Sequence, residues 1–178
     1  MNEHVEAAVK AVHKKFTAEQ QEYQGEVTLI LKPEDLLKAA TLLRDKYAFD
    51  MLVDETAVDY WPQETPRFHI VYQLYSTGKN ALLRLRVPLN GHDPYVDSLV
   101  LVWPVANWHE REIWDMFGVH FNGHPDQRRI LMPYDWQGHP LRKDYPLGYE
   151  EVQFTFNYDE IKLRKPYANV KPGRKSNV

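Results

Sequence analysis

The sequence predicts an α+β fold, in which an antiparallel sheet of about four strands carries helices on one face and is followed by an ordered loop region and an extended C-terminal arm. Two segments before residue 48 repeat their apolar residues every three or four positions, which is typical of amphipathic helices. Between residues 49 and 88 the repeat changes to two, which is typical of strands with one buried face. Because helices and strands do not alternate regularly, an antiparallel sheet is favoured over a parallel doubly wound one.

The first helix is expected over residues 3–16, and a strand over residues 26–31 follows it. The apolar stripe of this helix consists of Val5, Val9, Val12 and Phe16. A second helix begins at Pro33, because the fixed φ of proline suits the first helical position and the two acidic residues after it favour the positive helix start. Its apolar face consists of Leu36, Ala40, Leu43 and Tyr47.

Strands are expected over 49–54, 67–75 and 81–87, with residues 76–80 as the turn of a hairpin between the last two. In the first of these strands, the alternation groups Phe49, Met51 and Val53 on one face. The segment 93–106 is ambiguous, since its apolar stretch 99–103 fits either a buried strand or the end of a helix. A short strand is the favoured interpretation.

A third helix is expected over residues 107–117, with Asn107 as its N-cap, Glu110 reaching back to the cap, and Gly118 ending it. From 119 to 149, prolines and glycines recur too often for a helix, but the apolar and aromatic residues between them favour an ordered loop. We therefore predict a single α+β domain over residues 1–149, in which 107–149 supplies a docking helix and docking loops. Residues 150–178 are predicted to form an extended basic arm.

Composition narrows the possible functions of the 178-residue chain, which contains no cysteine and carries a formal charge of −3. The lack of cysteine excludes disulfides, thiolate zinc sites and the usual ligation of iron–sulfur clusters. No apolar stretch is long enough to span a membrane, and the first twenty residues do not resemble a secretory signal. Residues 161–178 contain six basic residues and no acidic one, so an acidic body carries a basic tail.

Charged residues of the third helix invite an acid/base interpretation. Arg111 and Asp115 are one turn apart and can pair, while Glu110 shares a face with Ile113 and Phe117. The sequence provides no nucleophile or base at a matching spacing. A solvent-facing or partner-facing helix with an exposed pair is therefore the favoured interpretation, and loss of that pair is expected to leave the isolated domain folded.

Histidines near this helix raise the alternative of a metal site, because Gly-His-Pro occurs at 123–125 and again at 138–140. A backbone explanation is favoured: glycine adopts positive φ readily, and a residue before proline is pushed towards extended conformations. No two histidines share one helical face at ligand spacing. Both copies are therefore predicted to be architectural turns.

One continuous run from 108 to 146 resembles a known family. Its segments are Glu110-Arg111-Glu112-Ile113-Trp114-Asp115-Met116-Phe117-Gly118, His124-Pro125-Asp126, Arg128-Arg129-Ile130-Leu131 and Gly138-His139-Pro140-Leu141-Arg142-Lys143-Asp144-Tyr145-Pro146. They resemble the signature of the 30-kDa subunit family of the proton-pumping NADH:quinone oxidoreductase, respiratory complex I. Two positions depart from the expected pattern: Trp114 stands where tyrosine is commoner, and Gln127 where leucine is commoner.

The resemblance implies a non-catalytic structural subunit of the peripheral arm, with no cofactor of its own. FMN, iron–sulfur clusters and quinone are then expected in partner subunits, and the quinone-module subunits of the 49-kDa and cluster-bearing types are the expected partners. It also implies a basic, aromatic C-terminal arm that lies along a neighbouring subunit. The expected interface residues are Glu110, Arg111, Glu112, Trp114, Asp115, Phe117, His124, Pro125, Arg128, Arg129, His139, Pro140, Arg142, Lys143, Asp144 and Tyr145.

Alternatives remain open at this point. The same signature would suit the homologous subunit of a membrane-bound hydrogenase or of a ferredoxin-driven complex. The histidines leave a metalloenzyme possible, and the basic tail leaves a nucleic-acid-binding module possible, although the acidic body opposes the latter. The resemblance and the absence of an arginine-rich leader favour a location on the cytoplasmic side of a bacterial inner membrane, with the membrane reached only through the complex.

Overall fold

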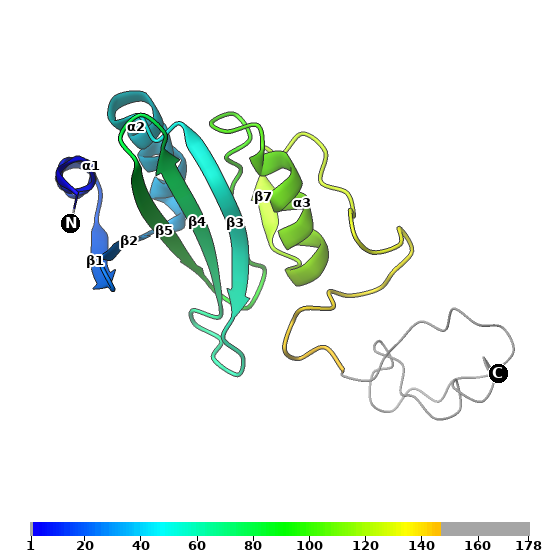
Figure 1. Ribbon diagram of the computed structural model, residues 1–178. Helices are drawn as coiled ribbons and strands as arrows, with labels where there is room; N and C mark the ends of the chain where they lie inside the picture. Colours follow the sequence, from blue (N-terminus) through cyan, green and yellow to red (C-terminus); the bar gives the residue numbers. More distant parts are fainter. Residues whose placement is uncertain (1, 147–178) are drawn as a thin grey trace, which may run out of the picture.

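The computed structural model of the chain describes residues 2–146, in which α1 lies beside one edge of a central sheet and α3 beside the other (Figure 1). The helices are α1 (Glu3–Lys15), α2 (Leu36–Tyr47) and α3 (Ala106–Phe117), with a short 3-10 turn, η1 (Pro33–Asp35), before α2. The strands are β1 (Ala18–Tyr23), β2 (Glu26–Leu31), β3 (Met51–Asp59), β4 (Phe68–Ser76), β5 (Ala81–Leu89), β6 (Tyr95–Asp97) and β7 (His120–Asn122).

The main sheet has five strands in the order β1-β2-β5-β4-β3, and all its pairs are antiparallel except β2–β5. The α+β class and the mostly antiparallel sheet are confirmed, but the sheet has one more strand than expected. The missing strand is β1, whose side chains are nearly all exposed. Strand prediction depends on an apolar face, and β1 has none. A second, two-stranded sheet joins β6 to β7 in parallel.

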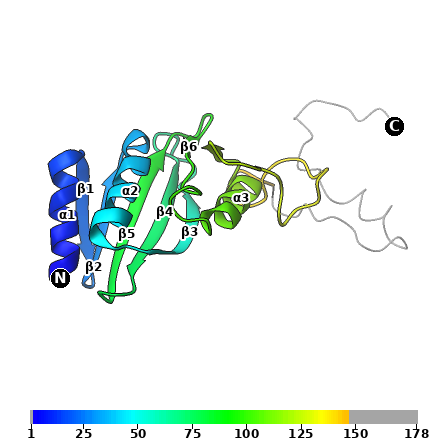
Figure 2. The same ribbon diagram turned by 90° about the horizontal axis from the view of Figure 1, so that it is seen from above.

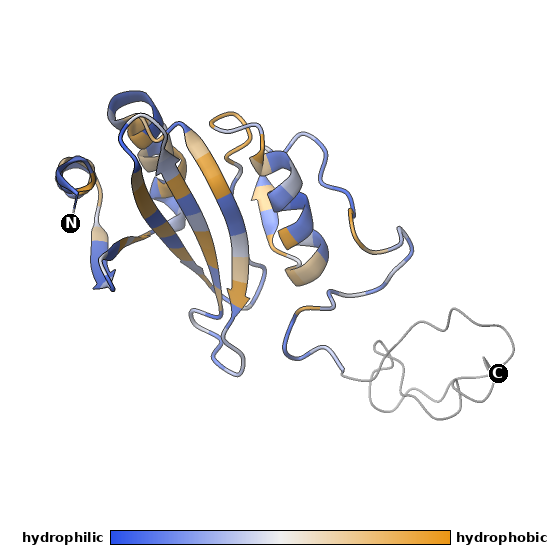
Figure 3. Cartoon of the chain, in the orientation of Figure 1, coloured by the Kyte–Doolittle hydropathy of each residue, from blue (hydrophilic) through white to orange (hydrophobic). Residues whose placement is uncertain are grey.

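One face of the main sheet forms the core. Along β4 and β5 every second side chain is buried and those between are partly or fully exposed, so hydrophobic and hydrophilic bands alternate along these strands in Figure 3. The buried residues of α1 and α2, together with Ala106 and Ile113 of α3, belong to the same cluster as the inward side chains of the sheet. Helices therefore cover a single face, as the sequence predicts. Each fully buried leucine of this cluster contributes about 1.5–3 kcal/mol.

Strand β3 contradicts the predicted alternation of its side chains. Met51 and Val53 are exposed, whereas Leu52 is buried, and the register with β4 shifts between Leu52 and Asp54. The bulge adds one residue to the strand and so exchanges its two faces. As a result Glu55 points into the protein.

The segment before α3 also differs from expectation. The short strand of this region is β6 at 95–97, and the apolar stretch 99–103 forms turns instead. Helix α3 begins at Ala106, and its N-cap residue Val105 makes no side-chain capping bond, so the predicted cap by Asn107 is wrong. Glu110 does not reach back to the helix start, because it accepts a hydrogen bond from the backbone N–H of Leu99 at 2.6 Å. The predicted end of the helix at Gly118, with φ of 71°, is confirmed.

Among residues 2–146, no helix is both long and apolar enough to cross a bilayer. The predicted arm at 150–178 lies outside the described residues. The predicted ordered loop is present after β7, although β7 itself was not expected. Figure 2 shows this loop on the side of α3 that faces away from the main sheet.

Candidate functional site

Helix α3 and the loop after it form one structural unit. We define the loop unit as residues 123–146, which contain no helix or strand and lie along α3 (yellow to orange in Figure 1). Backbone groups in such a segment cannot bond to a regular ladder, so they need other partners. Side chains of α3 and of the loop unit itself provide them.

Asp115 is the central acceptor of the unit. One oxygen of its fully buried carboxylate, Oδ2, accepts hydrogen bonds from the successive N–H groups of Ile130, Leu131 and Met132 at 3.0, 2.8 and 2.9 Å. The other oxygen pairs with the guanidinium of Arg129. Burial raises the pKa of Asp115. The hydrogen bonds from the Met132 N–H, from the Arg129 side chain and from the other two N–H groups lower it by more, so the pKa lies below its usual value.

Two arginines bind the carbonyl groups of the loop unit. Arg111 donates to the carbonyl oxygens of Arg128 and Arg129 at 3.1 and 3.2 Å. Arg129 donates from Nη2 to those of Trp136 and Gly138 at 2.7 and 3.0 Å. Each guanidinium offers five donors in a planar fork, which suits bonding to several carbonyls at once. The loop is thus held from its N–H side by Asp115 and from its carbonyl side by arginines.

The end of α3 contacts the second Gly-His-Pro turn. Nδ1 of His139 lies 3.0 Å from the carbonyl oxygen of Asp115, and its ring meets that of Trp114 edge to face. Burial lowers the pKa of His139, against the opposing effect of its bond to the Asp115 carbonyl. Arg142 donates to the carbonyls of Phe117 and Gly118, so this turn takes up the carbonyl groups left free where the helix ends.

A buried ion-pair network ties the far end of the loop unit to the main sheet. The guanidinium of Arg67 binds both carboxylate oxygens of Asp59 at 2.9 Å and those of Asp144 at 2.6 and 3.2 Å. The backbone N–H of Lys143 also donates to Asp59, and Arg67 lies over the ring of Phe68. The bond to Asp59 has the largest effect and raises the pKa of Arg67 above its usual value. Burial opposes this effect, and the bond to Asp144 adds to it. The loop unit is therefore anchored at both ends.

The predicted pair between Arg111 and Asp115 is wrong. The two side chains are buried and bind different parts of the loop unit, so α3 is not a solvent-facing helix along this side. Glu110 is fully buried as well. The expectation that the isolated domain stays folded without Arg111 or Asp115 rested on an exposed pair, and both side chains are buried, so a loss of stability is now expected.

The structure brings the remaining predicted interface residues together on α3 and the loop unit. Several of them have exposed side chains: Glu112, Pro125, Arg128, Lys143 and Asp144. Others are half-buried: Trp114, Phe117, His124, Arg129, His139, Pro140, Arg142 and Tyr145. Sequence reasoning missed Arg67 and Asp59, which stand in or beside strands far from the signature. The sequence offered one indication of this network, which is that Asp59 is a charged residue at an inward position of its strand.

Both Gly-His-Pro segments have the predicted positive φ at their glycines. Gly123 and Gly138 have φ of 78° and 84°. His124 accepts from the N–H of Asp126 through Nδ1 at 3.0 Å and lies 3.2 Å from the carbonyl of Asn107 through Nε2. Within residues 2–146, no three histidine or acidic side chains are grouped so that they could hold a metal ion.

Exposed apolar side chains gather on the outer side of the unit. Leu131, Tyr134 and Leu141 of the loop unit are 62%, 93% and 53% exposed, and Trp108 of α3 is exposed beside Arg111. Tyrosine, tryptophan and arginine are enriched among the residues that anchor protein interfaces. The arrangement suits a docking surface better than a reaction centre, because its buried charges are bound to backbone groups and to one another.

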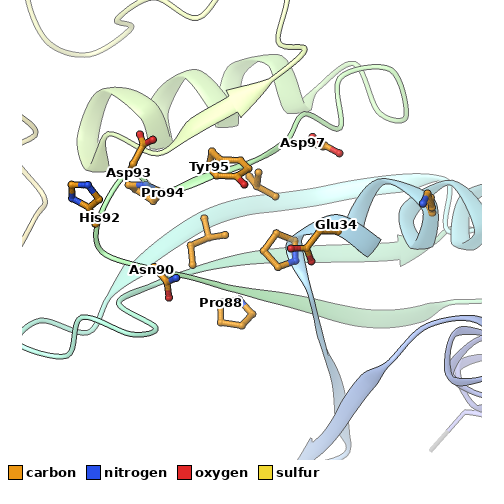
Figure 4. Close-up of a pocket in the computed structure, with 12 residues that line it drawn as sticks. Glu34, Pro88, Asn90, His92, Asp93, Pro94, Tyr95 and Asp97 are labelled. Atoms are coloured by element: carbon orange, nitrogen blue, oxygen red, sulfur yellow. The ribbon is translucent and has the colours of Figure 1, made fainter.

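A groove of about 510 Å³ lies elsewhere, between η1, the end of β5 and β6 (Figure 4). Glu34 lines one side, and Asp93, Tyr95 and Asp97 line the other. No predicted interface residue lies in it.

Residues 29–151, more than half of the chain, match the family model described as respiratory-chain NADH dehydrogenase, 30 Kd subunit. The chain belongs to this family. An NADH-quinone oxidoreductase subunit of Roseiflexus sp. (strain RS-1) is 49% identical over 149 residues, which cover 83% of this chain and 85% of that protein. The corresponding protein of Geobacter metallireducens is 46% identical over 143 residues, which cover 79% of this chain and 88% of that protein.

Solved structures agree with membership of the 30-kDa subunit family. A trypsin-resistant fragment (1–134) of Nqo5 is 29% identical with a TM-score of 0.61, covering 69% of this chain and 98% of the fragment. A chain of the membrane-bound sulfane sulfur reductase, an archaeal respiratory membrane complex, has a TM-score of 0.67 at 18% identity and covers 97% of this chain. The second likeness shows a shared fold.

Replacing the central acceptor should destabilise the isolated protein. We expect Asp115→Ala to lower the free energy of unfolding by about 3 kcal/mol, because Arg129 loses its buried partner and three N–H groups lose their acceptor. Urea unfolding measures the change. Glu112→Ala, an exposed site on the same helix, should stay within about 0.5 kcal/mol of the wild type. Equal effects of the two substitutions would contradict the role of Asp115.

The helix end allows a second substitution test. In Gly118→Ala, the added Cβ would lie 2.5 Å from the ring of His139 and 2.6 Å from Arg142, at a φ of 71°. We expect a loss of about 1–3 kcal/mol in the same unfolding measurement. The matched control is Gly78→Ala in the β4–β5 turn, where nothing lies within 4 Å of the new Cβ. A Gly118→Ala protein as stable as that control would show that this contact is not close-packed.

Proposed function

We propose that this chain is a structural subunit of the peripheral arm of NADH:quinone oxidoreductase, in the quinone module, and that it docks through α3 and the loop unit. FMN, iron–sulfur clusters and quinone would be carried by partner subunits. The absence of cysteine supports this division, because it removes the usual cluster ligands from the chain. The chain would then support electron transfer from NADH to quinone by assembling the proteins that perform it.

One observation carries the proposal: the loop unit is fixed by buried charges while its apolar side chains face outwards. Asp115 and Arg129 immobilise the backbone on either side of Leu131, and that side chain remains 62% exposed. Burying charges costs free energy, which here is offset by the ion pair and by the hydrogen bonds to the loop backbone. A loop that is ordered before binding loses less conformational entropy when a partner binds, so fixing it increases affinity.

The proposed partners are the 49-kDa-type and cluster-bearing subunits of the same complex. Membership of the family and the names of the relatives support this assignment. The chain would lie on the cytoplasmic side of a bacterial inner membrane and reach the bilayer only through the complex. Residues 150–178 would extend from the loop unit along the 49-kDa-type subunit, where their basic residues would meet an acidic surface.

Tyr134 provides a direct test of the docking surface. Because it is 93% exposed at the proposed contact, Tyr134→Ala should weaken binding to the co-expressed 49-kDa-type subunit by about tenfold or more, without changing the melting temperature of the free chain. Tyr23→Ala on β1 is the matched control, since Tyr23 is 73% exposed on the opposite side of the sheet. Wild-type affinity of the Tyr134→Ala protein, measured by interferometry, would remove this residue from the interface.

A shortened chain tests the arm separately. A protein that ends at Tyr149 should bind the same subunit more weakly than the full chain, and the difference should shrink as salt rises because the arm is basic. The pair should be compared at two salt concentrations in one titration series. Equal affinity at low salt would exclude the arm from the contact.

Native mass spectrometry of the membrane complex distinguishes the related assemblies. Flavin-bearing subunits that copurify with this chain would support the NADH-oxidising complex. Hydrogenase or ferredoxin-dependent subunits in their place would instead support the alternative complex that shares the signature.

A further inference from the structure

A cluster of buried acids lies between α3 and the main sheet. Glu55 of β3 is 3% exposed, and Glu110 of α3 and Tyr72 of β4 are 0% exposed. Glu55 reaches this position because the bulge of β3 turns it inwards, opposite Tyr72 in the register. Neither the assembly role nor the anchoring of the loop explains two carboxyl groups in the core.

Within residues 2–146, no lysine or arginine forms an ion pair with either carboxyl group. The groups that face Glu110 are the Ser98 hydroxyl and the N–H of Leu99 from the preceding turn, His124 from the loop unit, and Glu55 across the interface. Asp54, the acid next to Glu55, pairs with His109 on the outer side at 3.9 Å. Asp54 and Glu110 therefore both add negative potential at Glu55.

His124 does not neutralise Glu110 in this arrangement. Its Nε2 lies 4.0 Å from Oε2 of Glu110, beyond hydrogen-bond distance. Its Nδ1 accepts a hydrogen bond from the N–H of Asp126, so the single ring proton is on Nε2 and is directed to the carbonyl of Asn107. Both ring nitrogens of His124 are thus engaged by backbone groups and neither is bonded to the acid cluster.

Hydrogen-bond donors are too few for two carboxylates. Both oxygens of Glu55, Oε2 of Glu110 and the hydroxyl of Tyr72 are buried, and of these groups only the Tyr72 hydroxyl, which faces Glu55, can donate. An ionised carboxylate can only accept, whereas a protonated one also donates. One added proton supplies the missing donor and removes one of two like charges from the core. We propose that Glu55 and Glu110 share one bound proton, and that this proton fastens α3 to the sheet.

Electrostatics agrees with the geometry. Burial, then the charge of Glu110 and then that of Asp54 raise the pKa of Glu55 well above its usual value. Burial likewise raises the pKa of Glu110 to about 7, against the lowering effect of Ser98 and Leu99. A carboxyl whose pKa is raised by folding stabilises the fold below its unfolded pKa, and this contribution is lost as pH rises through the folded value. The contact between α3 and the sheet therefore weakens as pH rises from the ordinary glutamate pKa of about 4.3 to the raised folded value of about 7 at Glu110.

The pH dependence of stability tests the shared proton. The melting temperature of the full chain should fall by roughly 4–8 °C from about pH 5 to about pH 8. In Glu55→Gln the fall should be less than half as large, because the amide keeps the shape and donates a hydrogen bond without ionising. Glu112→Gln, an exposed site on α3, should fall like the wild type. An equal fall in Glu55→Gln and the wild type would overturn the proposal.

Infrared titration of the wild type provides a second measurement that needs no variant. At neutral pH the carbonyl absorption of a protonated carboxyl group should be present and should disappear as pH rises further, whereas ordinary carboxyl groups have ionised by about pH 5. Absence of that band at neutral pH would show that both glutamates are ionised. The proposal would then be wrong whether or not Glu55→Gln folds.

Discussion

The bonds made by Asp115 are the constraint on which the docking unit depends. Three consecutive N–H groups of a segment without regular structure share one carboxylate oxygen, and Arg129 takes the other. An arginine without that carboxylate would be a buried charge beside carbonyl groups, and the N–H groups would lack an acceptor. The buried carboxylate, the arginine and the N–H groups would each cost free energy if left without partners. They stabilise the protein only when they bind one another.

Most of the sheet could be predicted because its strands have one apolar face. The hairpin of β4 and β5 follows directly from alternation and a turn of hairpin length. Strand β1 could not be found in this way, since its exposed side chains carry no alternation and its identity depends on pairing with β2. The bulge in β3 was equally hidden, because the apolar residues on both sides of Leu52 disguise the change of face.

The predicted interface residues lie together on α3 and the loop unit, but the contacts among them were not predicted. Helical spacing suggested a pair of Arg111 with Asp115, and the true partners of Asp115 stand fourteen to seventeen positions later. Local spacing cannot reveal such contacts, because they depend on how the loop turns back. One signal was available: Glu110 shares a helical face with Ile113, and an acid on an apolar face indicates burial.

Helix α3 thus carries two kinds of buried carboxyl. Asp115 faces the loop unit, has an arginine and three N–H groups, and stays ionised because these outweigh burial. Glu110 faces the sheet, has one N–H group and a second acid, and its pKa is raised because burial prevails. Neither group is exposed to solvent, and the donors around Asp115 outnumber those around Glu110. Lower pH weakens the attachment of α3 to the loop unit through Asp115, and higher pH weakens its attachment to the sheet through Glu110. Helix α3 is therefore held most firmly between the lowered pKa of Asp115 and the raised pKa of Glu110.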